Sequence, residues 1–320
     1  MRELRSITAA FAVAIVASMA QAQTWPARPV TLVVGTSAGS GLDTIGRFLA
    51  QGLRERTGQA FVIENRAGAA GNIGAQSVAR AAPDGYTAFV GTISTHAINP
   101  YMLRNVGIDP VRDFQPVTTI FFIGFILIAN AQLPVNSVAE LSAYLKAHPG
   151  QLAYASGNQF GRIMAEWYRQ IVGFDALHVP YKSVPQALGD LFSGRVHFIF
   201  VDATIGISTV QSGKARALAV TGPKRNPGAP EIPTMIESGV PGFVADGWVA
   251  LFFPARTPIE IARKLAGLSN DVMTTDKARE FLRKAGTEPM PGSPESLAKS
   301  VVDDNAKWGT VIRKAGIEAE

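Results

Sequence analysis

The sequence contains no cysteine, only four histidines and no long apolar run past its first residues. Without cysteine there can be no disulfide, thiol nucleophile or zinc–thiolate site. The histidines are His96, His148, His178 and His197. No two of them have the spacing of a metal-binding pair, so we expect neither a metal nor a cofactor. The longest later apolar stretch, residues 118–131, contains Gly124 and is too short to span a membrane.

The excess of positive over negative charge is also small. Lys and Arg number 30 against 25 acidic residues, and the formal net charge is +5. These positive residues are scattered rather than gathered in a basic block, so nucleic acid is not an expected partner. A weakly positive surface instead favours small anionic ligands.

The first residues have the pattern of a secretory signal peptide. Arg2 and Arg5 precede an apolar run over residues 7–19, and Ala20-Gln21-Ala22 forms an A-x-A cleavage site. We therefore assign residues 1–22 to a signal peptide and expect the mature chain to be exported and soluble. The remainder, roughly 300 residues, is long enough for one large domain or two ordinary ones.

Residues 30–43 are predicted to form a buried strand, a loop of small residues and the first turn of a helix. Ser40 and Asp43 have the spacing of a capping box. Apolar residues then follow at steps of three and four up to Leu53, which is typical of one helix face. Glycines 35, 39 and 41 would let backbone amides converge above the helix amino terminus, where an anion is favoured.

Two phosphate-binding motifs do not match this loop. A phosphate-binding P-loop needs Lys and Ser or Thr where Leu42 and Asp43 stand, and a dinucleotide fingerprint needs a small residue at Thr44. The spacing of Gly35, Ser37 and Gly39 does match the nucleophile elbow of α/β-hydrolases, although no earlier strand is present to supply oxyanion donors. A secreted hydrolase using Ser37 and a bare turn without a ligand both stay open.

The rest of the chain alternates strands and helices up to residue 254 and looks helical from residue 258 onward. We predict crossings between two α/β halves near Gly124 and Trp248. The predicted fold class is therefore α/β, with the two-domain Venus-flytrap arrangement of periplasmic binding proteins and two crossing strands as its hinge. Lobe 1 would comprise residues 23–123 and 248–320, and lobe 2 residues 124–247.

Several polar residues lie where strands of such a sheet would end, the edge at which ligands bind in open α/β sheets. His96 lies in an expected polar loop over residues 92–100. Asp43 is interpreted as a helix cap rather than a general base. Asp202 could cap a helix or contact a ligand, and Arg162 could pair with Glu166 on its own helix or bind a carboxylate.

Several ordered motifs together resemble one family. They comprise Trp25, Arg28 and Pro29; Glu64, Asn65, Arg66, Gly68, Gly71 and Asn72; Ala82, Pro83, Asp84, Gly85 and Tyr86; Val179, Pro180, Tyr181 and Lys182; and Pro233, Thr234, Glu237 and Gly239. The chain resembles the Bug family, the TctC-like periplasmic receptors of tripartite tricarboxylate transporters. The resemblance covers essentially all of the mature chain.

The resemblance implies a type II-like flytrap fold, a periplasmic location and no catalysis. It also implies a monomer that binds a small organic anion through loop amides and delivers it to membrane subunits of the transporter. The ligand could be a mono-, di- or tricarboxylate, aromatic acids and amino acids included. A sensor role, with the closed lobes docking on a membrane kinase, is the alternative within this class.

The resemblance also places the binding residues on three loops and one acidic position. They are Thr36, Ser37, Ala38, Gly39, Ser40, Gly41 and Asp43 in the first loop; Thr92, Ser94, His96 and Asn99 in the second; Ser156, Asn158, Gln159, Phe160 and Arg162 in the third; and Asp202. Hydroxyls at Thr36 and Ser37 replace the prolines usual in the family. Phe160 and Arg162 depart from the family pattern too, and they predict a preference for dicarboxylates or for aromatic acids with a second acidic group.

Overall fold

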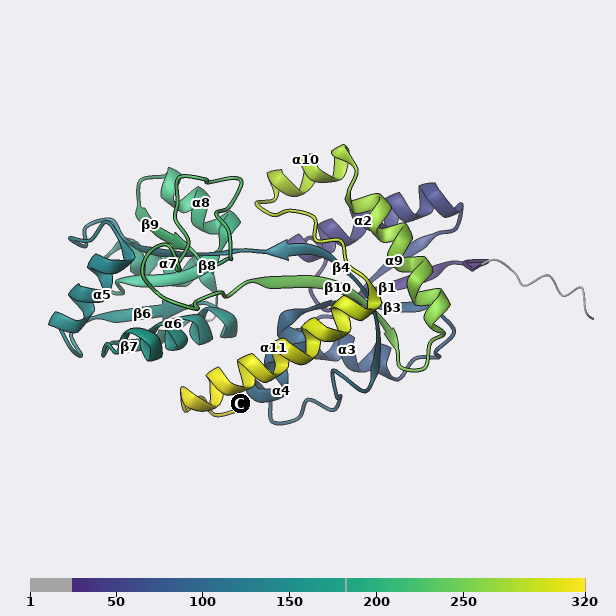
Figure 1. Cartoon of the computed structure of the whole chain (residues 1–320), viewed down its shortest axis with the longest axis horizontal. Coiled ribbons are helices and arrows are strands. Elements are labelled where there is room, and N and C mark those ends of the chain that lie inside the picture. The colour runs from purple at the N-terminus through teal and green to yellow at the C-terminus, as the bar shows by residue number, and fades with distance from the viewer. Residues whose placement is uncertain (1–24, 182, 320) are drawn as a thin grey trace, which may run out of the picture.

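The computed structural model describes residues 25–181 and 183–319, which form two α/β lobes (Figure 1). Each lobe is built around a five-stranded sheet. The predicted signal peptide lies outside the described residues. Within the described part of the chain, no helix combines the length and the apolar character needed to cross a membrane. The prediction of a two-lobed α/β fold is confirmed.

The sheet of lobe 1 has the strand order β2-β1-β3-β10-β4. Its strands are β1 (Val30–Val34), β2 (Phe61–Asn65), β3 (Thr87–Thr92), β4 (Phe114–Ile123) and β10 (Gly247–Pro254). β1 runs parallel to β2 and β3, whereas β10 runs antiparallel to β3 and β4. The helical elements are α2 (Gly41–Thr57), η1 (Ala69–Gly71), α3 (Asn72–Ala79), η2 (Ser94–Ile98), α4 (Asn99–Met102), α9 (Ile259–Met273), α10 (Asp276–Lys284) and α11 (Pro294–Lys314).

The sheet of lobe 2 has the strand order β7-β6-β8-β5-β9. Its strands are β5 (Phe125–Asn130), β6 (Ala153–Ser156), β7 (Leu177–Pro180), β8 (Phe198–Asp202) and β9 (Ala215–Val220). β6 runs parallel to β7 and β8, and β5 runs antiparallel to β8 and β9. The helices are α5 (Val138–Ala147), α6 (Gln159–Val172), α7 (Val184–Phe192) and α8 (Ala203–Gln211).

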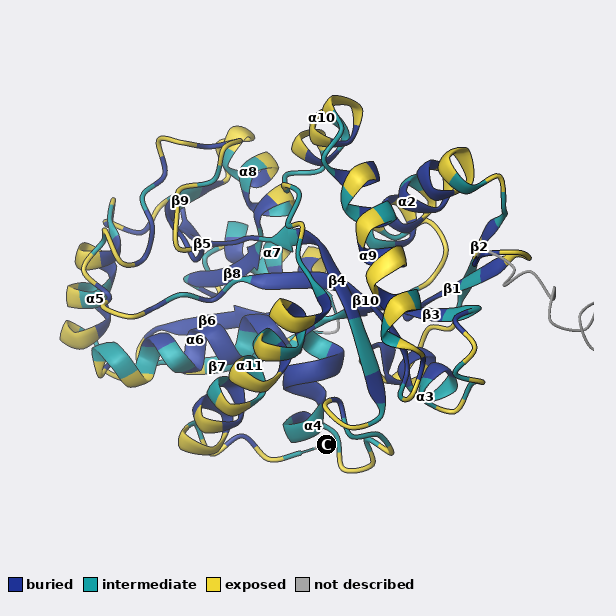
Figure 2. Ribbon diagram, turned by 45° about the vertical axis from the view of Figure 1, so that its right-hand side comes forward, coloured by how far each residue is buried: buried dark blue, intermediate teal, exposed yellow. Residues whose placement is uncertain are grey.

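Apolar patterning explains the layers of each lobe. β10 is buried along its whole length, and the helices present one buried and one exposed face (Figure 2). In α2 the expected face is buried, with Leu49 and Leu53 fully enclosed. Ser40 accepts the first-turn amide of Asp43, and the helix ends at Gly58, whose φ of 71° is the left-handed value that glycine tolerates.

The strand directions bring the predicted binding loops to one place. In lobe 1 the carboxyl end of β3 lies beside the start of β10, since Thr92 pairs with Val249. In lobe 2, Asp202 at the carboxyl end of β8 pairs with Phe125 at the start of β5. Both β10 and β5 start where the chain crosses between lobes. The carboxyl ends of the parallel strands in the two sheets therefore face each other.

The tract after residue 258 is not continuously helical as predicted. α10 and α11 are separated by an extended segment in which Pro289 forms a bridge with Phe121. Proline at 289 and 291 cannot donate the amides that a helix interior needs. In addition, α11 contacts α6 of lobe 2, so the link between the lobes is not confined to the two strands. The lobe boundaries given above stay our proposed division.

Candidate functional site

The first loop lies between β1 and α2 and exposes its tip. Ser37, Ala38 and Gly39 are exposed, and Gly39 has a φ of 80°. The hydroxyls of Thr36 and Ser40 lie 2.7 Å apart and close the base of the loop. The tip therefore presents small side chains and backbone next to the amino terminus of a 17-residue helix.

Asp43 holds this loop from below. Its carboxylate accepts the Gly39 amide at 2.9 Å, the Asn65 side-chain amide at 2.9 Å and Arg47 Nε at 3.0 Å. The hydrogen bond from Arg47, against the opposing effect of burial, lowers the pKa of Asp43 to about 2. A buried, fully engaged carboxylate would repel an anion, so the structure gives Asp43 a supporting position beneath the loop.

A third segment completes this support, and the predicted site did not include it. Asn65 donates to the Thr36 carbonyl at 3.1 Å as well as to Asp43. Gly71, with a φ of 87°, lies against the loop so closely that a Cβ on Gly35 would be 2.8 Å from its Cα. The glycine-rich motif over residues 65–72 was the sequence signal for this contact, because close backbone approach requires glycine.

The second loop is not the polar loop predicted. Residues 94–98 form the π-helical turn η2, which continues into α4. Thr95 Oγ1 donates to the Thr92 carbonyl at 2.9 Å, and Asn99 Nδ2 donates to the Ala70 carbonyl at 3.1 Å. Both side chains are buried, whereas Thr92 and Ser94 are half-buried. Local side-chain hydrogen bonds replace solvent here, which allows a polar sequence to lie inside the lobe.

His96 lies in the core of lobe 1. Its side chain is fully buried and stacks on Phe252 with ring centroids 3.8 Å apart. Nδ1 lies 2.9 Å from Thr95 Oγ1, whereas Nε2 has no hydrogen-bond partner among the described residues. Burial lowers the pKa of His96 to about 3, so the ring is neutral at pH 7. The structure therefore does not place the His96 ring among groups that a ligand could reach.

The third loop joins β6 to α6. Ser156 is buried, and its Oγ lies 2.7 Å from Nε2 of His178 on the neighbouring strand. The exposed Asn158 caps α6 by accepting the Gly161 amide at 2.7 Å. Gln159 is the first residue of α6 and is half-buried. A second helix amino terminus thus lies on the lobe face that looks toward the first loop.

Phe160 does not offer a free stacking surface. Its ring is only 5% exposed. It meets Phe125 and Trp308 edge to face, with centroids 4.8 Å and 5.0 Å away. Two protein rings therefore already pack against Phe160, and stacking of an aromatic ligand near it stays a prediction.

Arg162 is half-buried on the first turns of α6. Burial raises the pKa of Tyr154 and lowers the pKa of His178, and the positive charge of Arg162 lowers both, so its guanidinium lies near these two rings. Glu166, the partner considered for Arg162, accepts hydrogen bonds from Arg169 at 2.8 Å and from the Tyr154 hydroxyl. The carboxylate of Glu166 is therefore shared with other groups.

Asp202 is the amino-terminal cap of α8. Its Oδ1 accepts the Ile205 amide at 3.2 Å, and the side chain is half-buried at the end of β8. Burial raises the pKa of this carboxyl group. Of the two roles left open by the sequence, the helix cap is therefore present; contact with a ligand stays a prediction.

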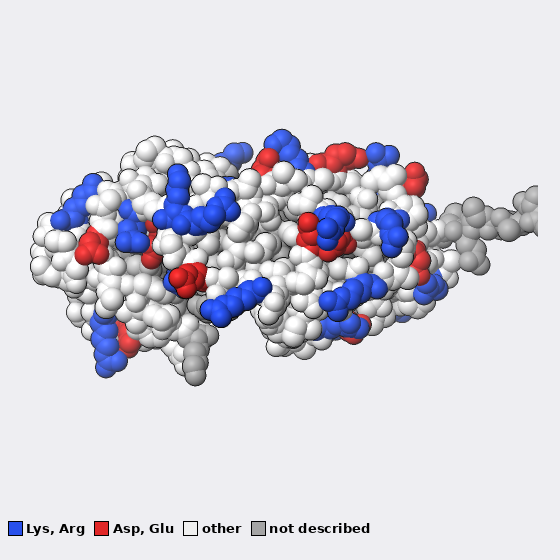
Figure 3. Space-filling model, turned by 90° about the horizontal axis from the view of Figure 1, so that it is seen from below, with Lys and Arg blue, Asp and Glu red and all other residues white. Residues whose placement is uncertain are grey.

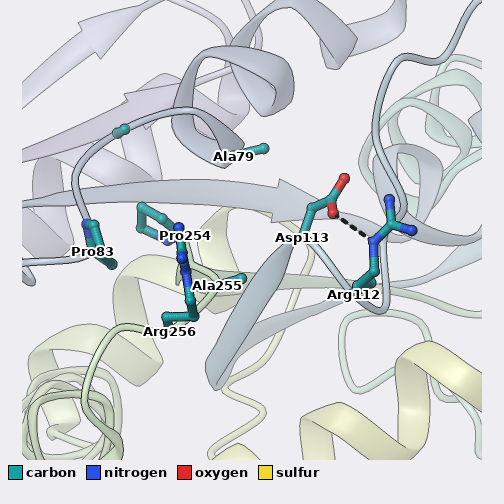
Figure 4. Close-up of a pocket in the computed structure, with 8 residues that line it drawn as sticks. Ala79, Pro83, Arg112, Asp113, Pro254, Ala255 and Arg256 are labelled. Carbon is teal, nitrogen blue, oxygen red and sulfur yellow. Dashed lines mark hydrogen bonds and ion pairs between the residues drawn. The ribbon is translucent and has the colours of Figure 1, made fainter.

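A cavity of about 370 Å³ lies elsewhere, at the far end of lobe 1 (Figure 4). It is lined by residues after α3, before β4 and after β10, including Arg112, Asp113 and Arg256. Arg112 Nε donates to Asp113 at 3.1 Å. No predicted site residue contributes to this cavity, so it is separate from the candidate site.

The candidate site offers hydrogen-bond donors from the loop backbone. Among the described residues no cluster of three or more His, Asp or Glu side chains could hold a metal ion. Lys and Arg are mixed with Asp and Glu on the face shown in Figure 3 rather than forming one basic surface. Loop amides and the amino termini of α2 and α6 are therefore the groups best suited to hold a small anion.

Comparison with known proteins identifies the family of the chain. A family model described as tripartite tricarboxylate transporter family receptor matches residues 45–317. Protein BugT of Bordetella pertussis is 31% identical over 309 residues, which are 95% of this chain and 94% of BugT. The periplasmic binding protein BugD, a solved structure, is 31% identical, with a TM-score of 0.75 over 92% of this chain and 100% of that one.

Solved structures show the same similarity. R. palustris Rpa4515 with adipate is 37% identical, with a TM-score of 0.80 over 92% of this chain and 100% of that one. MatC from Rhodopseudomonas palustris, with bound malate, is 29% identical, with a TM-score of 0.75 over 90% of this chain and 100% of that one. From its sequence and its structure alike, this chain belongs to the tripartite tricarboxylate transporter receptor family, as its Bug-like motifs indicated.

Proposed function

We propose that this protein is a periplasmic receptor that captures a small dicarboxylate between its lobes and delivers it to a membrane transporter of the tripartite tricarboxylate type. One observation carries the proposal. The carboxyl ends of the parallel strands in the two sheets face each other, in a chain 37% identical to a relative solved with adipate. Adipate and malate, found in two relatives, both carry two carboxylates.

The first carboxylate would bind at the loop over residues 36–41. The exposed tip is next to the amino terminus of α2, and Asp43 keeps the loop in shape from below. Backbone amides at a helix amino terminus hold an anion without a charged side chain. Arg162, on the facing lobe, is our candidate for the second carboxylate, since its planar group matches a carboxylate and stays charged.

We propose that the protein is a monomer without catalytic activity. A hydrolase would need a general base near Ser37. The Ser37 side chain has no hydrogen bond to a histidine or carboxylate within the described residues. A receptor that docks on a sensor kinase would present the same closed lobes to its partner. Ligand binding cannot distinguish this role from transport, whereas identification of the membrane partner can. Hydrolysis of chromogenic esters that disappears in Ser37→Ala would overturn the receptor proposal.

Thermal unfolding of the purified mature chain with matched acids tests the ligand class. A ligand present at a hundred times its Kd adds about 2.7 kcal/mol to the free energy of unfolding. We expect stabilisation by adipate and malate, and less by hexanoate, which has one carboxylate. Small-angle scattering with adipate should show a smaller radius of gyration, as hinge closure requires. Stabilisation by neutral sugars but by no acid would contradict the proposal.

A further inference from the structure

Helix α11 runs from lobe 1 onto lobe 2 (Figure 1). It packs on β4 and η2 of lobe 1 and also contacts α6 of lobe 2. At this second contact Gln170 Nε2 donates to the Val311 carbonyl at 3.2 Å. The helix therefore adds a link that the two crossing strands do not provide.

Trp308 forms the apolar part of this link. Its side chain is fully buried. Its ring meets Phe160 at 5.0 Å and Trp167 at 5.5 Å, both edge to face, and both partners belong to α6. The indole Nε1 has no hydrogen-bond partner in the part of the chain that the structure describes, so Trp308 holds α6 by packing alone.

Lys307 forms the polar part. Nζ donates at 2.6 Å to the carbonyl of Val244, which lies on the segment returning from lobe 2. The ammonium group lies 5.1 Å from the ring of Trp167 and 4.7 Å from that of Trp308, a cation–π arrangement. The half-buried lysine is thus directed at lobe 2 although its helix begins on lobe 1.

Two carboxylates accompany this cation. Asp304, one turn earlier on α11, accepts Trp248 Nε1 at 2.8 Å, and Trp248 lies on the crossing strand β10. Asp246 directly precedes that strand. Burial lowers the pKa of Lys307 and raises the pKa of both aspartates, while their opposite charges counter each of these shifts. Removal of Lys307 would therefore leave two partly buried carboxylates without the cation that lowers their pKa values.

We propose that α11 is a brace that fixes the pivot of lobe closure, with Lys307 and Trp308 as its positioning residues. Rings from both lobes fill this side of the crossing, so the lobes can rotate about the α11–α6 contact but cannot slide past it. A receptor with two strands alone would sample many lobe orientations. Apparent affinity falls in proportion to the fraction of molecules able to bind, so the brace raises affinity without touching the ligand.

The absence of native cysteine makes the lobe orientation measurable. Spin labels on Gln51→Cys in α2 and Lys146→Cys in α5, both exposed and on opposite lobes, report the distance between lobes without ligand. We expect Lys307→Met to broaden this distance distribution. Lys314→Met, the same substitution at an exposed position of the same helix, should leave it unchanged. The double variant Lys307→Met with Asp246→Asn should narrow it again, because one uncompensated charge is removed.

Affinity for adipate gives a second measurement, and only this part rests on the proposed function. Lys307→Met should raise the Kd for adipate about tenfold, although it replaces no residue of the binding loops. Lys314→Met should leave this Kd unchanged. If adipate fails to bind the unmodified protein, the proposed ligand class fails while the distance measurement still decides the brace.

Trp308→Phe provides an independent variant in case Lys307→Met does not fold. It keeps an aromatic ring and loses only part of the contact with α6, so we expect a smaller broadening in the same direction. A distance distribution that stays unchanged in the folded variants Lys307→Met and Trp308→Phe would overturn the brace. An unchanged distribution in Trp308→Phe alone would overturn it if Lys307→Met is unfolded.

Discussion

Arg47 Nε lies 3.0 Å from a carboxylate oxygen of Asp43, one helical turn earlier, and the Asp43 side chain is only 3% exposed. This pair, together with the amides of Gly39 and Asn65, keeps the first loop in place. The exposed loop tip therefore depends on the buried Asp43 carboxylate directly beneath it, which pairs with the more exposed Arg47.

Asp43→Asn should lower the free energy of unfolding by about 2–3 kcal/mol, since hydrogen bonds to a charged group are lost and Arg47 loses its partner. Urea denaturation measures this change. Asp84→Asn is the matched control, because Asp84 forms an exposed ion pair with Arg28. Exposed pairs contribute about 0–1 kcal/mol. Equal losses in both variants would contradict the supporting role of Asp43.

Stability should fall in acid, and His96 and Asp43 are two of the groups responsible, beside His178 and His197, whose pKa values burial also lowers. The pKa of His96 is about 3 in the fold, below its unfolded value, so its contribution decreases as the pH falls below 6.5. Between pH 6.5 and pH 5 this amounts to about 2 kcal/mol. The pKa of Asp43 is about 2, so its contribution persists above pH 3.8 and is lost as the pH falls toward 2.

Denaturation curves at several pH values separate these contributions. His96→Phe keeps a ring against Phe252 and removes one titrating group, so it should reduce the pH dependence of stability between pH 6.5 and pH 5 to the part that His178 and His197 contribute. Asp43→Asn should leave that range unchanged and flatten the dependence below pH 4. A slope between pH 6.5 and pH 5 that is the same in His96→Phe and in the unmodified protein would refute this assignment.

Asp202→Ala should lower the free energy of unfolding by about 1 kcal/mol, the usual loss of a helix cap. If Asp202 also contacts the ligand or its water, adipate binding should weaken by about 1–3 kcal/mol. Ser137→Ala, which removes the cap of α5 away from the loops, should cost similar stability without changing affinity. Asp202→Ser keeps a capping oxygen, and calorimetry on it isolates the carboxylate. Unchanged affinity in both Asp202 variants would leave the residue as a cap only.

Arg162→Gln should erase the preference for dicarboxylates. Loss of a charged hydrogen-bond partner should weaken adipate binding by about 1.5–3 kcal/mol and leave hexanoate binding nearly unchanged. Arg169→Gln, on the same helix and paired with Glu166, is the control. Calorimetric titration of both acids measures the difference. Equal losses for the two acids, or no loss for either, would exclude Arg162 as the specificity residue.

Local signals in the sequence predicted the scaffold well. The helix start at Ser40 is present, because capping depends on a few adjacent residues. The crossing at Gly124 was also foreseen, since one buried strand ends before it and another begins after it. These features are encoded within a few residues of where they occur.

Contacts between segments that are distant in the chain were harder to predict from the sequence. The polar residues around His96 suggested a loop, although partners such as Phe252 lie far away in the chain. The helical pattern after residue 258 does not indicate that Trp308 meets α6 of the other lobe. A repeating pattern shows which side of a helix is buried, whereas the identity of the opposing surface depends on the whole fold.

The aromatic side chains at the contact between α11 and α6, here called the seam, have a practical consequence for spectroscopy. Of the four tryptophans in the sequence, Trp167, Trp248 and Trp308 lie at or beside the contact between α11 and α6, and only Trp25 lies elsewhere. Indole emission responds to nearby rings, charges and water. Rearrangement of this seam should therefore change the intrinsic tryptophan fluorescence of the protein. Fluorescence titration of the unlabelled chain with a ligand would then report the motion of the lobes.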